Sequence, residues 1–193
     1  MSEPLLGQLE TYYLLLAKWN ATINLTGLDL ESLADPVLDR LLIEPVQAAR
    51  YIDATAHSII DIGSGGGSPA IPLVAVCDWL QLTMVESRSR KVVFLREAAR
   101  ELGLRATVLG SRYETLLGDV QFTRAFDVLT IRAVRTSRDI LGDLSRLISE
   151  QGHLFLFTSA AAPAASVPPE LSLRNQYSLE TAGSVLLDFK VEH

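Results

Sequence analysis

The 193 residues suffice for one domain with a full hydrophobic core, and 48% hydrophobic against 21% charged residues excludes a disordered chain. No apolar stretch approaches the ~20 residues of a membrane helix, and the N-terminal residues lack the pattern of a secretory signal, so we expect no membrane partner. A single cysteine excludes an internal disulfide and favours the cytoplasm, and three scattered histidines give no metal site.

The net charge of −6 argues against nucleic-acid binding over the whole surface. The charges are nevertheless unevenly distributed, because residues 88–138 hold eleven Lys and Arg against five Asp and Glu. Arginine, which contributes fourteen of the seventeen cations, suits phosphate oxygens and stacks on bases. We therefore expect a basic face that contacts RNA, although the solvated side of an amphipathic helix explains several of these charges equally well.

The first fifty residues are predicted to be helical. Apolar residues recur at helical spacing over 4–19, and the polar segment "WNATINLTGLD" ends that helix. Helical periodicity resumes over 29–51, with interruptions expected near Pro36 and Pro45. We predict a helical extension over residues 1–52 that covers one edge of a sheet domain over residues 53–193, the two forming one compact monomer.

From Ser58 onward, strand and helix patterns alternate along the chain. The predicted strands are 58–62, 81–86, 106–110, 126–131 and 153–158, with helices at 70–79, 89–102, 112–118 and 136–149. Such alternation predicts parallel strands with right-handed crossovers, which is a doubly wound α/β sheet. Two further strands, 171–178 and 184–191, have no helix between them and are predicted to pair antiparallel at the sheet edge.

The segment "SIIDIGSGGGSPAIPL" places four glycines between the first strand and the first helix of the sheet domain. Glycine permits positive φ and a close approach of the backbone to a ligand. The helix start offers N–H groups, and Pro69 and Pro72 fit its first turn. A tight turn without a ligand would need only one or two glycines, so a ligand is favoured.

Two acids narrow the choice of ligand. The dinucleotide pattern G-x-G-x-x-G fails at Ser68, whereas Asp61-x-Gly63-x-Gly65-x-Gly67 resembles the first motif of class I methyltransferases, which bind S-adenosylmethionine. Asp61 could hold the loop by accepting from its N–H groups, or reach a cationic part of the ligand. Glu86, at the tip of the second strand, can accept both hydroxyls of a ribose, although a solvated strand-end acid is the plain alternative. The terminal antiparallel pair favours a methyltransferase over an oxidoreductase.

Six segments in order carry a more specific resemblance. They are "WNATINLTG", "LDRL", "IIDIGSGGGSPAIPL", "SRSRKVVFLREAARELGL", "GSRYE" and "FDVLTIRAV". Together they resemble the bacterial small-subunit ribosomal RNA guanine-N7 methyltransferase family, also called glucose-inhibited division protein B, over about residues 10–160. The resemblance implies a class I methyltransferase sheet with a helical N-terminal extension. It also implies S-adenosylmethionine as cofactor, N7 of one guanine in 16S ribosomal RNA as target, and ribosomal RNA or the 30S subunit as partner.

The resemblance also assigns residues. The loop from Gly63 through Ser64 and Gly65 to Gly67 would hold the methionine end of the cofactor, and Glu86 its ribose. The residues that would border the adenine follow the third strand: Ser111, Arg112, Tyr113 and Glu114. The residues implied beside the methyl group and the incoming base are Arg132, at the tip of the fourth strand, with Asn24 and Asp39 facing the same cleft.

Guanine N7 carries an unprotonated lone pair, so its methylation needs alignment but no general base. Arg132 is accordingly predicted to bind a phosphate or position the base; an ion pair with Asp127 is the alternative. The chain lacks the His that the family pattern has before "LDRL", and it has Phe157-Thr158-Ser159 where that pattern has Lys-Gly. Two other functions therefore stay open: a diverged methyltransferase for a small molecule or a protein, and a non-catalytic cofactor-binding protein.

Overall fold

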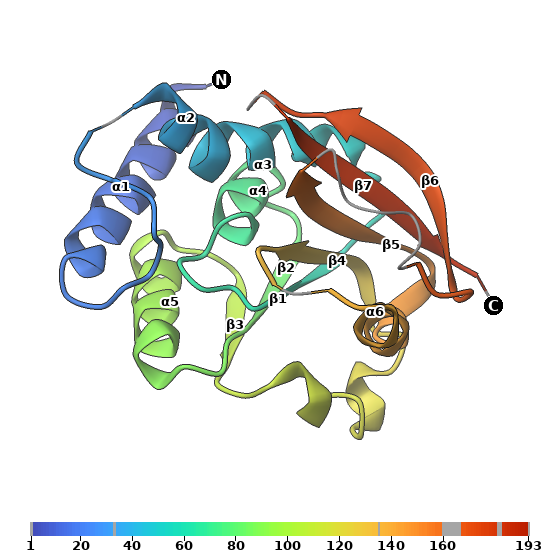
Figure 1. Ribbon diagram of the computed structural model, residues 1–193. Coiled ribbons are helices and arrows are strands. Elements are labelled where there is room, and N and C mark those ends of the chain that lie inside the picture. Colours follow the sequence, from blue (N-terminus) through green and yellow to red (C-terminus); the bar gives the residue numbers. More distant parts are fainter. Residues whose placement is uncertain (1, 33, 135, 160–166, 181–182, 193) are drawn as a thin grey trace.

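The computed structural model describes residues 2–32, 34–134, 136–159, 167–180 and 183–192. Within these residues, seven strands form one sheet in the order β3-β2-β1-β4-β5-β7-β6 (Figure 1). The first five strands pair in parallel, and β7 lies antiparallel between β5 and β6. The predicted doubly wound sheet and its terminal antiparallel pair are therefore confirmed. The strands are β1 (Ser58–Ile62), β2 (Gln81–Val85), β3 (Ala106–Leu109), β4 (Phe126–Arg132), β5 (Ile148–Ser159), β6 (Leu171–Ser178) and β7 (Ser184–Val191).

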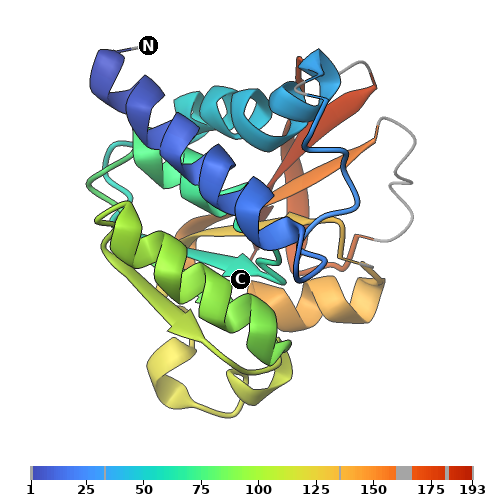
Figure 2. The same cartoon turned by 90° about the vertical axis from the view of Figure 1, so that its left-hand side faces the viewer.

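Helices cover both faces of this sheet (Figures 1 and 2). Along β1, Ile59 belongs to the hydrophobic cluster under the N-terminal helices, whereas Ile60 and Ile62 belong to the cluster on the opposite face. A strand buried on both sides must alternate in this way, and Asp61 consequently points to the same side as Ile59. The first face carries α1 (Glu3–Asn20), α2 (Asp35–Leu38), α3 (Glu44–Ala48), α4 (Ala70–Val76) and α5 (Ser89–Glu101); α6 (Arg138–Ser145) packs on the second.

The second helical stretch differs from its prediction. Helical backbone runs from α2 through a π-helical turn, Asp39–Ile43, into α3 and a 3-10 turn, Ala49–Tyr51, so neither proline interrupts it. Pro36 lies in the first turn of α2, where its missing N–H is not needed. Pro45 is accommodated by the wider π turn, in which the N–H of Glu44 bonds the carbonyl of Asp39. The described residues of 29–34 are not helical, and Leu33 lies outside the described residues.

Other helix and strand boundaries also differ from those that the sequence predicted. The helix predicted over 112–118 is only a 3-10 turn, Tyr113–Thr115, and the one predicted over 136–149 ends at Ser145 because β5 already begins at Ile148. The polar residues 149–151 do not show the alternation of a buried strand, so the sequence did not predict that β5 starts here. The register between β4 and β5 shifts at these residues. Gly152 is required at the shift, because a Cβ at that position would lie 2.8 Å from the carbonyl oxygen of Asp127.

One hydrophobic cluster contains residues of both the N-terminal helices and the sheet domain, among them Tyr12, Leu16, Leu73 and Phe94. The two predicted parts therefore pack against each other, while the division at residue 52 stays a prediction. Among the described helices, none combines the length and the apolar character that crossing a membrane would require.

Candidate active site

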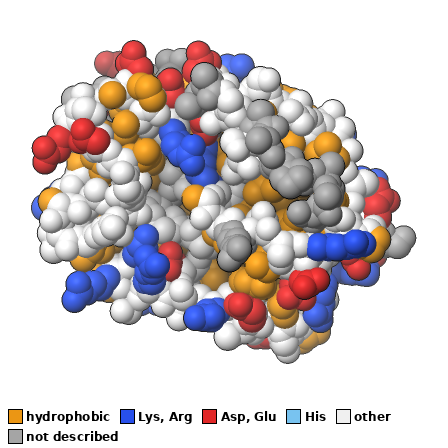
Figure 3. All heavy atoms as spheres, viewed as in Figure 1, with side chains coloured by type: hydrophobic (Ala, Val, Ile, Leu, Met, Phe, Trp, Pro, Cys, Tyr) orange, Lys and Arg blue, Asp and Glu red, His pale blue; other side chains and the backbone are white. Residues whose placement is uncertain are grey.

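A cavity of about 510 Å³, here called the glycine-loop cavity, opens at the carboxyl ends of β1, β2 and β4. The N-terminal helices and their connection line one side of it through residues 25–28, Arg40 and Leu41. The glycine loop (63–66) lines the second side, and the third side comprises Glu86, Arg88, Lys91 and residues 132–134. Figure 3 shows this face hollowed at its centre, with Lys and Arg side chains beside the hollow and over α5. Ligands of open α/β sheets bind at this position.

The glycines shape the floor of the cavity. Gly63 has a φ of +73°, and a Cβ there would meet Val134 at 2.6 Å. Gly65 has a φ of +53°, yet an added Cβ would meet nothing closer than 3.7 Å. Gly65 is therefore required by its backbone conformation, and the space above it remains open to the cavity.

Glu86 holds the glycine loop in place. Its Oε2 accepts from the N–H of Gly65 at 3.0 Å, and its Oε1 accepts from the N–H of Arg88 at 2.8 Å. These bonds orient a carboxylate that is 8% exposed and lines the cavity. The sequence had suggested Asp61 for bonding the loop N–H groups, and this was wrong: the side chain from the neighbouring strand makes that contact.

Asp61 is instead buried beneath the loop. Its Oδ1 accepts from the hydroxyl of Thr130 on β4 at 2.6 Å, and its Oδ2 has no hydrogen-bond partner among the described residues. Burial raises the pKa of Asp61 from 3.8 to about 6, although the hydrogen bond from Thr130 favours the ionised form. The carboxyl group is thus an incompletely satisfied acceptor next to the glycine-loop cavity.

A smaller cavity of about 190 Å³, here called the Tyr113 cavity, adjoins the first. Both cavities share Gly63, Glu86 and Val134. The structure therefore brings the segment after β3 together with the glycine loop and Glu86, although they lie far apart in sequence. The predicted residues that line the Tyr113 cavity are Ser111, Arg112, Tyr113 and Glu114.

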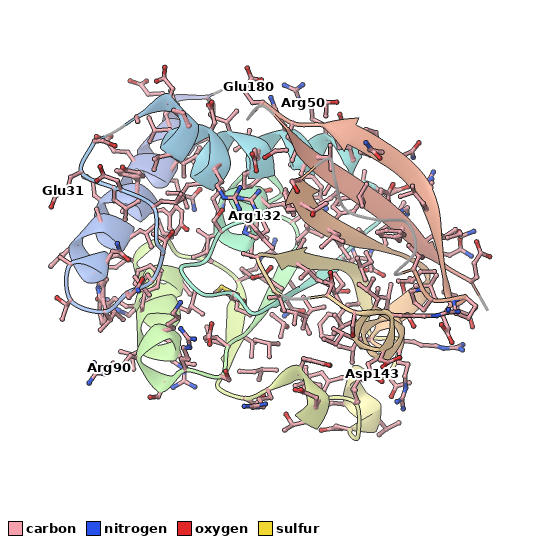
Figure 4. The ribbon with its side chains drawn as sticks, viewed as in Figure 1. Glu31, Arg50, Arg90, Arg132, Asp143 and Glu180 are labelled. Atoms are coloured by element: carbon pink, nitrogen blue, oxygen red, sulfur yellow. The ribbon has the colours of Figure 1, made fainter. Side chains whose placement is uncertain are left out.

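Arg132 lies where the N-terminal helices meet the sheet (Figure 4). Its Nη2 donates to Oε2 of Glu44 at 2.8 Å, and the two side chains are 8% and 2% exposed. Its guanidinium also lies 4.4 Å from the ring centroid of Phe157. The alternative partner Asp127 was wrong, because that residue lies near the opposite end of β4 and accepts from the N–H groups of His57 and Ser58.

Pro45 explains the remaining contacts of Arg132. A proline has no N–H, so the carbonyls of Arg40 and Leu41, its π-type and α-type partners, lose their backbone donor. Nη1 of Arg132 donates to the carbonyl of Arg40, and the hydroxyl of Ser68 donates to that of Leu41 at 2.8 Å. The π turn is thereby fastened to the sheet and to the glycine loop. Burial lowers the pKa of Arg132 to about 10, and nearby Glu44 opposes this shift.

The N-terminal helices also contact the loop directly. The hydroxyl of Tyr12 on α1 donates to the carbonyl of Gly66 at 2.7 Å, and Nζ of Lys91 donates to the carbonyl of Leu25 at 3.1 Å. Asn24 and Asp39 were predicted to face this cleft. Asn24 is exposed and Asp39 half-buried, and the residues that line the cavity are their chain neighbours.

Three residues of the site escaped the sequence analysis: Tyr12, Glu44 and Lys91. In the sequence, Tyr12 cannot be told apart from the other apolar positions of an amphipathic helix. Glu44 could have been noticed, because it is the only acid among the apolar residues of "LLIEPV". No His or Cys is among the described residues that line the glycine-loop and Tyr113 cavities, so these cavities offer positioning and electrostatics but no such base.

Comparison with known proteins agrees with this architecture. A family model described as rRNA small subunit methyltransferase G (GidB) matches residues 5–166. The chain belongs to this family. The protein of that name from Jannaschia sp. is 37% identical over 74% of this chain and 65% of its own length; that from Geobacillus thermodenitrificans is 34% identical over 89% and 69%. The Stenotrophomonas maltophilia protein is 38% identical over 74% and 60%, so the chain spans about two thirds of the length of these relatives.

Solved structures of lower sequence identity share the fold of this protein. A SAM-dependent methyltransferase from Aquifex aeolicus superposes with a TM-score of 0.61 at 14% identity, over 84% of this chain and 96% of its own. A ribosomal protein L11 methylase from Lactobacillus delbrueckii gives a TM-score of 0.57 at 14% identity, over 77% of each chain. These neighbours confirm the class I methyltransferase sheet that the sequence predicted.

Proposed function

We propose that this protein uses S-adenosylmethionine to methylate N7 of a guanine in 16S ribosomal RNA. The observation that carries the proposal is the Glu86 carboxylate, which accepts from the N–H of Gly65 and lines a cavity between the glycine loop and the strand ends. Family membership supplies the RNA target, because the curated relatives are named as small-subunit ribosomal RNA methyltransferases.

The residues present fit the cofactor. Glu86 keeps acceptor capacity beyond its two backbone bonds and would take the ribose hydroxyls. The open space above Gly65 and the cationic Lys91 suit the methionine end, and the Tyr113 cavity, with Ser111, Arg112, Tyr113 and Glu114, suits the adenine. When bound, the cofactor supplies an electrophilic methyl group on a sulfonium.

The protein's contribution to the reaction is alignment. Guanine N7 has a free lone pair, so the residues that line the site need only orient the base and exclude water. Arg132 stays protonated at neutral pH, since its pKa of about 10 lies well above 7, and it is held by Glu44 and the carbonyl of Arg40. It therefore positions neighbouring groups and transfers no proton.

Cations around the cavity would bind the RNA backbone. Arg40 and Arg88 line the glycine-loop cavity, and α5 adds further basic side chains beside it. Asn24 and Asp39, next in the chain to lining residues, remain candidates for contact with the RNA. We propose 16S ribosomal RNA, alone or in the 30S subunit, as the partner, and such a substrate would be met in the cytoplasm. The monomeric state stays a prediction.

Methylation of 16S ribosomal RNA from a host that lacks the gene tests this function. The purified protein with S-adenosylmethionine should methylate one guanine at N7 in that RNA or in its 30S subunits, and RNA from the parent strain should accept no methyl group. Persistence of the N7 methyl group in the deletion strain would show that the target is wrong. Binding of NAD in place of S-adenosylhomocysteine would show that the cofactor is wrong.

A further inference from the structure

Two buried carboxylate oxygens in the described part of the chain have no hydrogen-bond partner: Oδ2 of Asp61 and Oε1 of Glu44. Asp61 lies beneath the glycine loop, in the site already described. Glu44 lies on the other side of Arg132, in a helix that the sequence analysis did not connect with function. A buried carboxylate oxygen without a donor is unfavourable, so such an atom calls for a ligand or a partner.

Arg132 does not satisfy Oε1 of Glu44. The guanidinium gives Nη2 to Oε2 of Glu44 at 2.8 Å, while Nη1 bonds the carbonyl of Arg40 and lies 3.3 Å from the hydroxyl of Ser68. Its ring contact with Phe157 holds it in this arrangement. The ion pair therefore fixes the orientation of the Glu44 carboxylate and leaves Oε1 buried without a donor.

Glu44 borders a third cavity of about 250 Å³, here called the Glu44 cavity. It shares Arg40, Arg132 and residues 133–134 with the glycine-loop cavity, so the two adjoin along Arg132. Its far wall is formed by Leu156, Phe157 and the end of β5. Apolar side chains and a guanidinium plane are surfaces on which unstacked RNA bases rest.

We propose that Glu44 selects guanine by accepting from the Watson–Crick edge of the target base, the 2-amino group donating to Oε1 and N1–H to the same carboxylate. This inference rests on the proposed function. Guanine carries these two donors on the edge opposite N7, so a base held at Glu44 directs N7 away from it, toward the adjoining glycine-loop cavity. Adenine places an acceptor, N1, at the same position and is repelled by the carboxylate.

The test removes each half of this contact. Inosine lacks the 2-amino group of guanosine but keeps N7 and N1–H, and Glu44→Gln removes the charge at nearly constant volume. We expect the wild-type protein to methylate 16S ribosomal RNA with inosine at the target position with a kcat/KM roughly 10- to 100-fold below that for guanosine. Glu44→Gln should lower kcat/KM for guanosine and bring the guanosine-to-inosine ratio close to one.

The matched control is Glu180→Gln, an exposed acid that accepts from Gln47 on α3 and should keep the wild-type ratio. Unchanged affinity for S-adenosylhomocysteine shows that Glu44→Gln is folded; if it is not, the inosine comparison in the wild-type protein decides alone. Equal rates on inosine and guanosine, or wild-type discrimination by Glu44→Gln, would overturn the inference. Failure of the wild-type protein to methylate guanosine would instead overturn the proposed function.

Discussion

The two ends of the parallel strands both carry cavities, and they differ in how their polar groups are satisfied. The larger cavity, about 570 Å³, lies at the amino ends and is lined by Asp127, His153 and Arg174. His153 pairs through Nδ1 with Oδ1 of Asp188 at 2.7 Å, and its Nε2 lies 3.1 Å from Nη1 of Arg174. Asp127 accepts from the chain segment that leads into β1. These polar groups are therefore hydrogen-bonded within the protein.

At the carboxyl ends the cavities are smaller, yet the polar groups are left incomplete. Oδ2 of Asp61 and Oε1 of Glu44 lack partners among the described residues, and the space above Gly65 is open. The volume of the single largest of these cavities would point to the amino ends. The unsatisfied hydrogen-bonding capacity at the carboxyl ends is what favours them as the proposed ligand site.

The largest effect is expected where a buried charge loses its partner. Arg132→Ala leaves the Glu44 carboxylate buried without a cation, which should lower the free energy of unfolding by about 3–5 kcal/mol. Arg124→Ala removes an exposed pair with Glu150 and should lower it by less than about 1 kcal/mol. Urea denaturation of both variants measures the difference. Equal losses would contradict a buried, tightly held Arg132.

Acidic residues at the two ends should respond to pH in opposite directions. The folded pKa of Asp61 is about 6 against 3.8 for the free side chain, so the folded state holds the proton more tightly and wild-type stability falls as pH rises from 4 to 6. Asp61→Asn removes this titration. Its stability relative to wild type should therefore rise by about 2 kcal/mol between pH 4 and pH 7.

Asp127 gives the contrasting result. Burial raises the pKa of Asp127, but the hydrogen bonds from His57 and Ser58 lower it by more than burial raises it. The net pKa therefore lies below the usual value. Its contribution to stability is present above the unfolded pKa and is lost as pH falls. Asp127→Asn should thus lose most stability, relative to wild type, at neutral pH. Urea unfolding curves from pH 4 to 7 check Asp61→Asn, and curves from pH 6 down to about pH 2 check Asp127→Asn, because the lowered pKa of Asp127 places its titration below 3.8. Parallel pH profiles of the two variants across this whole range would refute the distinction between the two ends.

A third change acts on cofactor affinity more than on stability. Glu86→Gln removes the charge from the carboxylate assigned to the ribose, and we expect S-adenosylhomocysteine to bind roughly 10- to 100-fold more weakly by calorimetry. Glu101→Gln, an exposed acid at the end of α5, is the control and should bind like wild type. Unaltered binding by Glu86→Gln would remove the ribose assignment.

The smallest effect separates backbone strain from cavity function. Gly65 and Gly103 both have positive φ, +53° and +61°, and an added Cβ clashes at neither position. Alanine at either site should lower the free energy of unfolding by about 1–2 kcal/mol, because only the backbone conformation is penalised. Only Gly65→Ala should also weaken S-adenosylhomocysteine binding. Equal binding by the two variants would show that the ligand does not approach Gly65.

Much of the fold could be predicted because short segments of the sequence determine it. The apolar run of β1, the glycines after it and the terminal pair of strands each carry their own pattern, and the alternation of elements fixes the class of sheet. Glu86 could be found in the same way, since a residue that ends the second parallel strand must lie beside the loop that follows the first. The family resemblance added the segment after β3.

The rest depended on contacts between distant residues. Glu44 and Arg132 are 88 positions apart, and neither segment contains a pattern that indicates a contact with the other. Asp127 is close to Arg132 in sequence but lies toward the other end of the same strand. Pro45 predicted an interruption, whereas side chains from β4 and the glycine loop satisfy the carbonyls that it leaves without donors and keep the helical segment continuous.

A crystal structure of the protein with S-adenosylhomocysteine would show where the nucleoside binds. We expect the adenosyl group at the carboxyl ends of the strands, with ribose oxygens against the Glu86 carboxylate and adenine beside Tyr113. Density for the nucleoside in the larger amino-end cavity, or in neither place at saturating ligand, would contradict it.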